Sequence, residues 1–187
     1  MNEKNVKVDK VYDKPDAKLQ NEAFRFCKVE KLDKKPFEQG WSKKGYQWND
    51  PSLQAWLQEG GNYGVMGGHG DLIILDADEL QRLQDLGIID GLPETFTVKT
   101  PGRGGLHFYY TCPGIEKKMA LYDPEETAED QKGRLSYKHV ADLVAAGMQA
   151  VGPGSIRAFP AGELRSYEIV NDVPIASITK EELLAIL

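Results

Sequence analysis

The alternation of apolar and polar residues along the chain predicts many short strands and few helices. Alternating or continuous apolar runs mark five strands, at 24–30, 62–66, 71–76, 95–100 and 106–110. Two more strands are expected around Gly147 within 139–155, and a hairpin over 157–170 turns at Ala161-Gly162. Since predicted hairpins outnumber helical crossovers, the pattern favours an α+β fold with a largely antiparallel sheet.

Helix signals are fewer, but their ends are well marked. Asp50 is expected to cap a helix that ends at Gly60. A second helix is expected over 79–86, because Gly87 supplies a C-terminal signal. The C-terminal stretch TKEELLAIL begins with the T-x-x-E pattern of a capping box and predicts a final helix.

Three stretches between these elements have weaker patterns. The strands 62–66 and 71–76 are expected to pair as a tight hairpin through the Gly-rich turn 67–70. Residues 113–139 are polar with mixed charge, and we expect an irregular or helical excursion there. Residues 1–16 are expected to form a flexible or irregular lead-in.

Composition narrows the class of protein without fixing its function. With 187 residues, 41% hydrophobic and 28% charged, the chain is expected to form one domain over 1–187. No apolar run approaches the roughly 20 residues that span a bilayer, and a secretory signal is not evident, so a cytoplasmic location without membrane contact is expected. Cys27 and Cys112 stand too far apart in sequence to indicate a zinc knuckle or a disulfide framework.

Charge is distributed unevenly along the chain. The net charge of −6 argues against strong nucleic-acid binding by this chain alone, since phosphate contacts need Lys and Arg. Residues 1–44 nonetheless carry 12 basic against 8 acidic side chains. A basic front fits a polyanion that touches one part of the surface, and a merely solvated Lys-rich segment fits equally well. Trp41, Tyr46 and Trp48 could stack on bases, but packing in the hydrophobic core is the preferred interpretation.

The strongest chemical signal is a pair of aspartates at the end of DLIILDAD. In an extended strand Asp76 and Asp78 point the same way, about 6–7 Å apart, because alternate side chains share a face. Two carboxylates that face one point repel each other unless a cation lies between them, and hard oxygen ligands suit Mg²⁺ or Mn²⁺. The competing interpretation makes Asp78 the N-cap of the helix that follows and Asp76 a polar strand end.

A second signal is the sequence TPGRGGLHFYY. Gly104 and Gly105 would let backbone N–H groups approach a phosphate, with Arg103 as a charged fork and His107 as a donor. An ordinary tight turn followed by a strand histidine explains the same residues.

Two further positions are polar where the pattern is apolar or glycine-rich. Asp142 interrupts the apolar stretch HVADLVAA, which is costly unless the carboxylate is paired, hydrogen-bonded or bound to metal. A structural salt bridge is the alternative. Ser155 follows a strand in the turn GPGS, where an exposed hydroxyl would be a weak candidate for a phosphate contact.

The order of these motifs resembles the prim-pol domain of the archaeo-eukaryotic primase superfamily. A strand ending in D-x-D is followed by R-G-G-x-H, then by an aspartate in an apolar stretch and a G-P-G-S turn. KKPFEQGW and NYGVMGG upstream, and a Y-x-I hairpin and PIASI downstream, are also similar to that family. The resemblance spans about residues 24–180.

The resemblance implies roles for particular residues. The acidic pair of the family falls on Asp76 and Asp78, its third acid on Asp142, and its small-x-His motif on Gly105 and His107. The small residue is often Ser in the family and is Gly105 here. The turn that reads P-P-S in relatives is Pro153-Gly154-Ser155 here, which weakens the implied phosphate role of Ser155. Relatives with a zinc-binding stem carry a Cys/His cluster that this chain lacks between 108 and 141, so no zinc is expected.

The resemblance also implies a reaction, a two-metal phosphoryl transfer. Three carboxylates would hold two Mg²⁺ or Mn²⁺ ions that activate a 3′-hydroxyl and stabilise the leaving pyrophosphate. Arg103, Gly104, Gly105, His107 and Ser155 would bind an NTP or dNTP. A single-stranded DNA template is the implied partner, together with a helicase or DNA-binding region of the same protein or operon. The alternatives are a non-catalytic nucleic-acid-binding module and a metal-dependent enzyme of small nucleotides.

Overall fold

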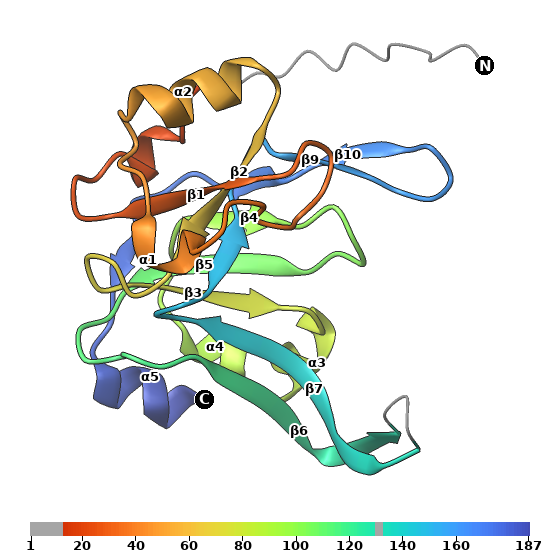
Figure 1. Cartoon of the computed structure of the whole chain (residues 1–187). Coiled ribbons are helices and arrows are strands. Elements are labelled where there is room, and N and C mark those ends of the chain that lie inside the picture. Colours follow the sequence, from red (N-terminus) through yellow and green to blue (C-terminus); the bar gives the residue numbers. More distant parts are fainter. Residues whose placement is uncertain (1–12, 130–132) are drawn as a thin grey trace.

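Two antiparallel sheets contain most of the hydrophobic residues of the chain (Figure 1). The structure is a computed structural model, and it describes residues 13–129 and 133–187. Most of the predicted lead-in therefore lies outside the described residues. The observed fold is α+β with largely antiparallel pairing, as the alternation pattern predicted.

The larger sheet has seven strands, in the order β11-β4-β5-β3-β7-β6, with β12 parallel to β5. Its strands are β3 (Leu72–Ala77), β4 (Thr97–Lys99), β5 (Leu106–Thr111), β6 (Met119–Glu129), β7 (Leu135–Val144), β11 (Glu168–Asn171) and β12 (Ala176–Ser177). Strand β3 lies between β5 and β7, and it is the strand that ends in the aspartate pair.

The smaller sheet has three strands, in the order β1-β2-β8. They are β1 (Arg25–Val29), β2 (Asn62–Met66) and β8 (Gln149–Val151). The predicted hairpin of 62–66 with 71–76 is wrong, because β2 pairs with β1 and β8 whereas β3 belongs to the larger sheet. Gly67 explains the separation. It approaches the backbone of β7 so closely that a Cβ there would lie 2.7 Å from the Val144 carbonyl oxygen, and the chain crosses between the sheets at this point.

The two faces of β3 belong to two different hydrophobic cores. Leu72 and Ile74 pack towards the smaller sheet and helix α2 (Pro51–Gln58), together with partly buried aromatic residues that include Tyr46 and Trp48. Ile73 and Leu75 pack on the opposite face against the helices. A strand buried on both faces reads as a continuous apolar run, which is why LIIL is uninterrupted.

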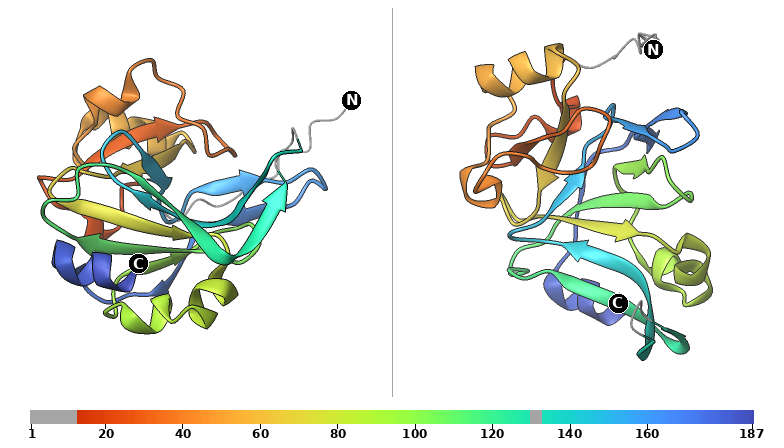
Figure 2. Two further views of the ribbon diagram at one scale, coloured as in Figure 1. Left: turned by 90° about the horizontal axis from the view of Figure 1, so that it is seen from below. Right: turned by 45° about the vertical axis from the view of Figure 1, so that its right-hand side comes forward.

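Short helices cover the face of the larger sheet that carries Ile73 and Leu75, and one end of the smaller sheet (Figures 1 and 2). They are η1 (Ala17–Leu19), α1 (Trp41–Lys44), α2 (Pro51–Gln58), α3 (Leu80–Asp85), α4 (Ile88–Gly91) and α5 (Lys180–Ile186). The predicted caps are confirmed at α2, where the Asp50 carboxylate accepts from the Ser52 N–H, and at α5, which has a full capping box. Gly87 has the expected left-handed backbone, and α4 follows it directly. Within the described residues, helices are too short or too polar to cross a membrane.

Within residues 113–139, expected to be irregular or helical, 119–129 form strand β6 and 135–139 form the first part of β7. The two strands make a long hairpin that projects from the edge of the sheet (Figure 1). Sequence periodicity fails here because two register irregularities, next to Tyr122 on β6, break the alternation. At the second one the Asp123 carboxylate accepts backbone N–H bonds from Glu125 and Glu126.

The other predicted hairpins are confirmed. Strands β4 and β5 pair around the turn PGRGG, where the Thr100 N–H donates to the Gly105 carbonyl. Strands β9 (Ile156–Ala158) and β10 (Leu164–Ser166) pair around a turn that contains Gly162 at φ +81°. The β9–β10 and β6–β7 hairpins project on the same side of the molecule (Figure 2).

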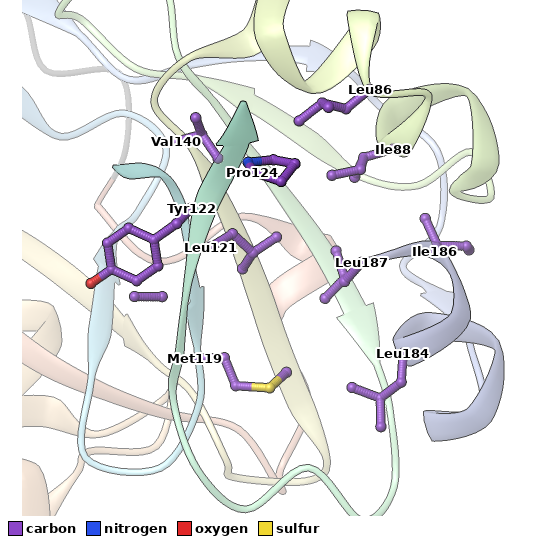
Figure 3. Close-up of a pocket in the computed structure, with 11 residues that line it drawn as sticks. Leu86, Ile88, Met119, Leu121, Tyr122, Pro124, Val140, Leu184, Ile186 and Leu187 are labelled. Carbon is purple, nitrogen blue, oxygen red and sulfur yellow. The ribbon is translucent and has the colours of Figure 1, made fainter. Parts of the chain in front are cut away.

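An apolar hollow of about 490 Å³ lies on the helix-covered face of the sheet (Figure 3). Aliphatic side chains of β6, α4 and α5 line it, among them Leu121, Ile88 and Ile186. None of the described residues in its wall is charged, so it offers packing surface and no chemistry.

We predict that the Arg82–Asp123 pair holds the hairpin to helix α3. The guanidinium contacts both carboxylate oxygens, at 2.5 and 2.8 Å, and the Asp123 side chain is 0% exposed. Asp123→Ala removes the two guanidinium contacts and leaves the backbone N–H groups of Glu125 and Glu126 without their acceptor, so it should lower the free energy of unfolding by about 1–3 kcal/mol. Glu125, which contacts the same arginine but is 75% exposed, is the matched control, and Glu125→Ala should cost less than about 1 kcal/mol. Urea unfolding measures both, and equal costs would contradict the prediction.

Candidate active site

A row of polar side chains crosses the centre of the larger sheet. Asp76 of β3 lies directly opposite His107 of β5 on one side and directly opposite Asp142 of β7 on the other. Opposite residues of antiparallel strands have Cα atoms about 4.5–5.5 Å apart and side chains on one face. The sheet register therefore brings together three residues that are far apart in the sequence.

The closest contact in this row joins Asp76 and His107. The His107 Nε2 lies 3.3 Å from Asp76 Oδ1, and the imidazole is almost fully buried. Burial alone would raise the pKa of Asp76, but His107, Lys34 and His139 outweigh it and leave that pKa below its ordinary value. Asp76 is thus held as a carboxylate. The other ring nitrogen, His107 Nδ1, is a buried polar atom without a hydrogen-bond partner in the described structure, an arrangement typical of functional sites.

Asp78 is not the N-cap of the following helix. Glu79 occupies that position, and its side chain makes no capping bond either. Asp78 is exposed at the end of β3, where desolvation and the neighbouring carboxylates of Asp76 and Asp142 raise its pKa. The structure therefore gives Asp78 no capping role and places it near two other carboxylates, whose effect on its pKa His139 and Lys34 only partly oppose.

His139 is a site residue that the sequence reasoning missed. Its Nε2 lies 3.3 Å from Asp142 Oδ1, and its ring contacts Tyr122 edge to face. An i, i+3 histidine–aspartate pair in a regular strand would point to opposite faces. The extra residue Val140 on β7, opposite the step from Leu121 to Tyr122, brings both side chains to one face. No signal in the sequence reveals that irregularity.

Asp76, Asp78, His107 and His139 line a polar cavity of about 950 Å³, and Asp142 lies behind His139, outside the cavity wall. Asp76, Asp78 and Glu79 give its wall an acidic part. The rest of the wall carries five cationic side chains from the loop after β1, the β4–β5 turn and the β9–β10 hairpin: Lys34, Lys35, Arg103, Arg157 and Arg165. Of these, only Arg103 was predicted as a site residue. The others come from segments whose proximity depends on the fold.

The two arginines of the β9–β10 hairpin are held in different ways. Both guanidinium groups stack on the Phe159 ring, with centroid distances of 5.0 Å for Arg157 and 4.8 Å for Arg165. Arg165 also contacts Glu163 and donates to the Pro101 carbonyl. Arg157 has no carboxylate partner in the described part of the chain, so its charge is available to an anion in the cavity.

The predicted glycine turn lies at the cavity wall. Gly104 has φ +91°, which favours glycine, and Arg103 is exposed. Gly105 is required for another reason, since a Cβ there would lie 2.8 Å from the Ala77 carbonyl oxygen and 3.2 Å from Thr100 Oγ1. The absence of a side chain at 105 thus lets β5 run close to the end of β3.

The expectation that Ser155 is exposed is wrong. Its side chain is 0% exposed and lies outside the cavity wall. The hydroxyl oxygen accepts from the Tyr63 N–H at 3.4 Å, and the adjacent backbone pairs with Tyr167. Ser155 joins the β2 and β9 regions in this structure, and its predicted phosphate contact has no geometric support.

A divalent cation suits the donors at this site, although the structure does not present a preformed cage. Among the described residues, no set of three His, Cys, Asp or Glu side chains is already spaced to hold an ion. The carboxylates of Asp76, Asp78 and Asp142 are nevertheless close enough for two of them to raise the pKa of the third. Clustered carboxylates that repel one another are the donor set that Mg²⁺ and Mn²⁺ prefer.

Together the fold and the site define an α+β protein with acidic strand ends in a largely basic cavity. The chain belongs to the Prim-Pol family. The family model, described as bifunctional DNA primase/polymerase, N-terminal, matches residues 17–181. This confirms the resemblance seen in the motifs. Membership implies an activity of the DNA primase/polymerase type, with DNA and nucleotides as substrates. Comparison with curated proteins gives no match.

We predict that position 105 does not accept a side chain, whereas position 102 does. Gly105→Ala must displace backbone or Thr100, so it should lower the free energy of unfolding by about 1–3 kcal/mol and weaken nucleotide binding. Gly102 lies in the same turn, and nothing lies within 4 Å of a Cβ built there. Gly102→Ala should leave stability within about 1 kcal/mol of wild type. Urea unfolding of the two variants checks this, and a harmless Gly105→Ala would contradict it.

We also predict that Asp78 destabilises the metal-free protein. A raised pKa in the folded state means that protonated Asp78 is stabilising at low pH, and that this contribution is lost as pH rises through the folded pKa. At pH 7 Asp78→Asn should therefore stabilise the protein, by less than about 1 kcal/mol because the side chain is exposed. The gain should vanish in acid.

The same variant should lose its response to metal. Mn²⁺ should raise the melting temperature of the wild type and not that of Asp78→Asn, since a ligand stabilises only the state that binds it. Thermal unfolding with and without Mn²⁺ at pH 7 and pH 4 gives all the comparisons. If Asp78→Asn is less stable than wild type without metal, the electrostatic account of the site is wrong.

Proposed function

We propose that this chain is a template-dependent nucleotidyltransferase that extends or starts a nucleic-acid strand. The observation that supports it best is the separation of charge in one cavity, with carboxylates at the end of β3 and five cations on the surrounding loops. Carboxylates suit a divalent cation, and the cations suit a polyphosphate. A nucleoside triphosphate with a bound metal ion brings both the divalent cation for the carboxylates and the polyphosphate for the cationic side chains.

Asp76, Asp78 and Asp142 would hold the divalent ions. Mg²⁺ or Mn²⁺ bound there would supply charge neutralisation for an attacking 3′-hydroxyl and a leaving pyrophosphate. The low pKa of Asp76 keeps that ligand ionised at neutral pH. His107, 3.3 Å from it, orients the carboxylate through Nε2, as second-sphere histidines and carboxylates do for metal ligands.

The cationic part of the cavity would bind the triphosphate. Arg157 is preorganised by its stacking on Phe159, and Lys34 lies close enough to lower the pKa of Asp76. Arg103 and the Gly104–Gly105 backbone would approach from the β4–β5 turn. Phosphoryl transfer asks mainly for positioning and charge neutralisation. The chain therefore needs no nucleophilic side chain of its own.

The acidic net charge argues that template affinity comes partly from elsewhere. We infer that a helicase or DNA-binding region acts beside this domain. Single-stranded DNA should then bind these 187 residues weakly and in a strongly salt-dependent way, because phosphate contacts release counterions.

We predict that primer extension separates the acidic and basic parts of the cavity. With labelled nucleotides and Mn²⁺, Asp76→Ala or Asp142→Ala should reduce kcat about 10²-fold or more, because a transition-state contact is lost. Arg157→Ala should raise the nucleotide KM about tenfold, the loss of one charge-assisted hydrogen bond. Lys43→Ala is the matched control, since Lys43 is an exposed lysine outside the cavity wall.

The assay also tests the competing functions. A non-catalytic binding module would show no incorporation with either nucleotide set. An enzyme of small nucleotides would release pyrophosphate at the same rate without a template. Either result would overturn the proposal.

A further inference from the structure

A strip of three rings and one leucine leads away from the acidic row along the β6–β7 hairpin, and all but the first ring are exposed. The strip consists of His139, Tyr122, Tyr137 and Leu135. Tyr122, Tyr137 and Leu135 are 53%, 58% and 69% exposed. Exposed large side chains that lie together, rather than singly, mark interaction surfaces.

All four side chains lie on the face of the sheet that carries the aspartates. Tyr122 is paired with His139, and Ala120, two residues before it, is paired with Asp142. Figure 3 shows Tyr122 on the opposite side of β6 from Leu121, which faces the helices. Tyr137 and Leu135 share a face with His139, because alternate residues of a strand lie on one face, and the extra residue at Val140 puts that face on the side of Asp142. The strip thus begins beside Asp142 and runs outward.

The acidic side chains of the hairpin are largely neutralised. Arg82 contacts Asp123 and Glu125, at 2.5 and 2.7 Å. Lys138 lies between Tyr137 and His139 in the sequence, and its Nζ is 3.2 Å from Glu126 Oε2. Glu129 lies opposite Leu135 in the β6–β7 strand pair, at the outer end of the strip. A polyanion can therefore approach the rings between Asp142 and Tyr137 without meeting an unpaired carboxylate of Asp123, Glu125 or Glu126.

We propose that this strip is a stacking platform for the bases of a single-stranded template. Aromatic side chains spaced along a surface bind single strands irrespective of sequence, because every base has a π-face. Tyr122 and Tyr137 are diagonal neighbours on adjacent strands, which places their rings close enough to act together. The platform is continuous with the cavity through His139, which lines both. The identity of the strand as template rests on the proposed polymerase function.

Stacking on the rings and contacts to phosphates contribute separately to the affinity for single-stranded DNA, and binding measurements at several salt concentrations distinguish them. We expect Tyr122→Ala/Tyr137→Ala to weaken binding of a fluorescent oligothymidylate about tenfold or more, measured by anisotropy without divalent metal. The dependence of affinity on salt should keep the wild-type slope, because phosphate contacts are intact. Tyr122→Phe/Tyr137→Phe should bind like wild type. Val170→Ala, at an exposed position of edge strand β11, is the matched control and should also bind like wild type.

Photocrosslinking locates the contact directly. An oligonucleotide that carries 5-iododeoxyuridine should crosslink to the peptides that contain Tyr122 or Tyr137, identified by mass spectrometry. This measurement uses the unaltered chain, so it holds even if the alanine variant folds poorly. In primer extension the alanine variant should raise the template KM and keep the wild-type kcat at saturating template.

The outcomes distinguish this inference from the proposed function. If the wild type extends primers while the alanine variant binds oligothymidylate normally and crosslinks lie elsewhere, the platform is wrong and the polymerase stands. If the phenylalanine variant loses as much affinity as the alanine variant, stacking is wrong. If the alanine variant loses only binding to a protein partner, the strip is a protein-docking surface and the inference fails. If both tyrosine peptides crosslink but no nucleotide is incorporated, single-strand binding stands and the polymerase falls.

Discussion

The pairing of β3 with β5 and β7 is the constraint on which the site depends. One register places Asp76 opposite both His107 and Asp142. A shift of one residue in either ladder would send a whole set of side chains to the other face of the sheet. A slip of one residue would also turn Asp76 into the helix-covered core that holds Ile73 and Leu75, where an unpaired carboxylate is costly. The same packing that makes the sheet stable therefore determines where the acids meet.

The fold also keeps opposite charges on separate elements. The carboxylates of the cavity wall stand on β3 and on the two residues that follow it, whereas the cations stand on the loop after β1, the β4–β5 turn and the β9–β10 hairpin. Direct pairing of acids with bases across the cavity would neutralise both sets. Instead Arg165 is paired within its own hairpin, and Arg157 stacks on Phe159. The cost is like-charge repulsion at Asp78, which is typical of sites where stability and function conflict.

Sequence patterns predicted local elements well and spatial neighbours less well. The caps at Asp50 and Thr179 were predictable, because capping depends on residues within one helical turn. The partner of β2 was not, since the close approach at Gly67 is visible only in three dimensions.

Nor could β6 be predicted, because the irregularity beside Tyr122 removes the alternation that marks strands. The aspartates and His107 were found through their motifs. His139, Lys34 and Arg157 join the site only through the fold, and the buried position of Ser155 ran against its turn-like sequence.

The central claim is that Asp76, Asp78 and Asp142 jointly hold divalent cations, and anomalous diffraction tests it most directly. Crystals grown with Mn²⁺ and a nonhydrolysable nucleoside triphosphate should show two anomalous peaks about 3.5–4 Å apart, within ligand distance of these carboxylates. The triphosphate should lie against the cationic wall. Manganese bound elsewhere, or Asp142 turned towards His139 with no metal contact, would contradict the account.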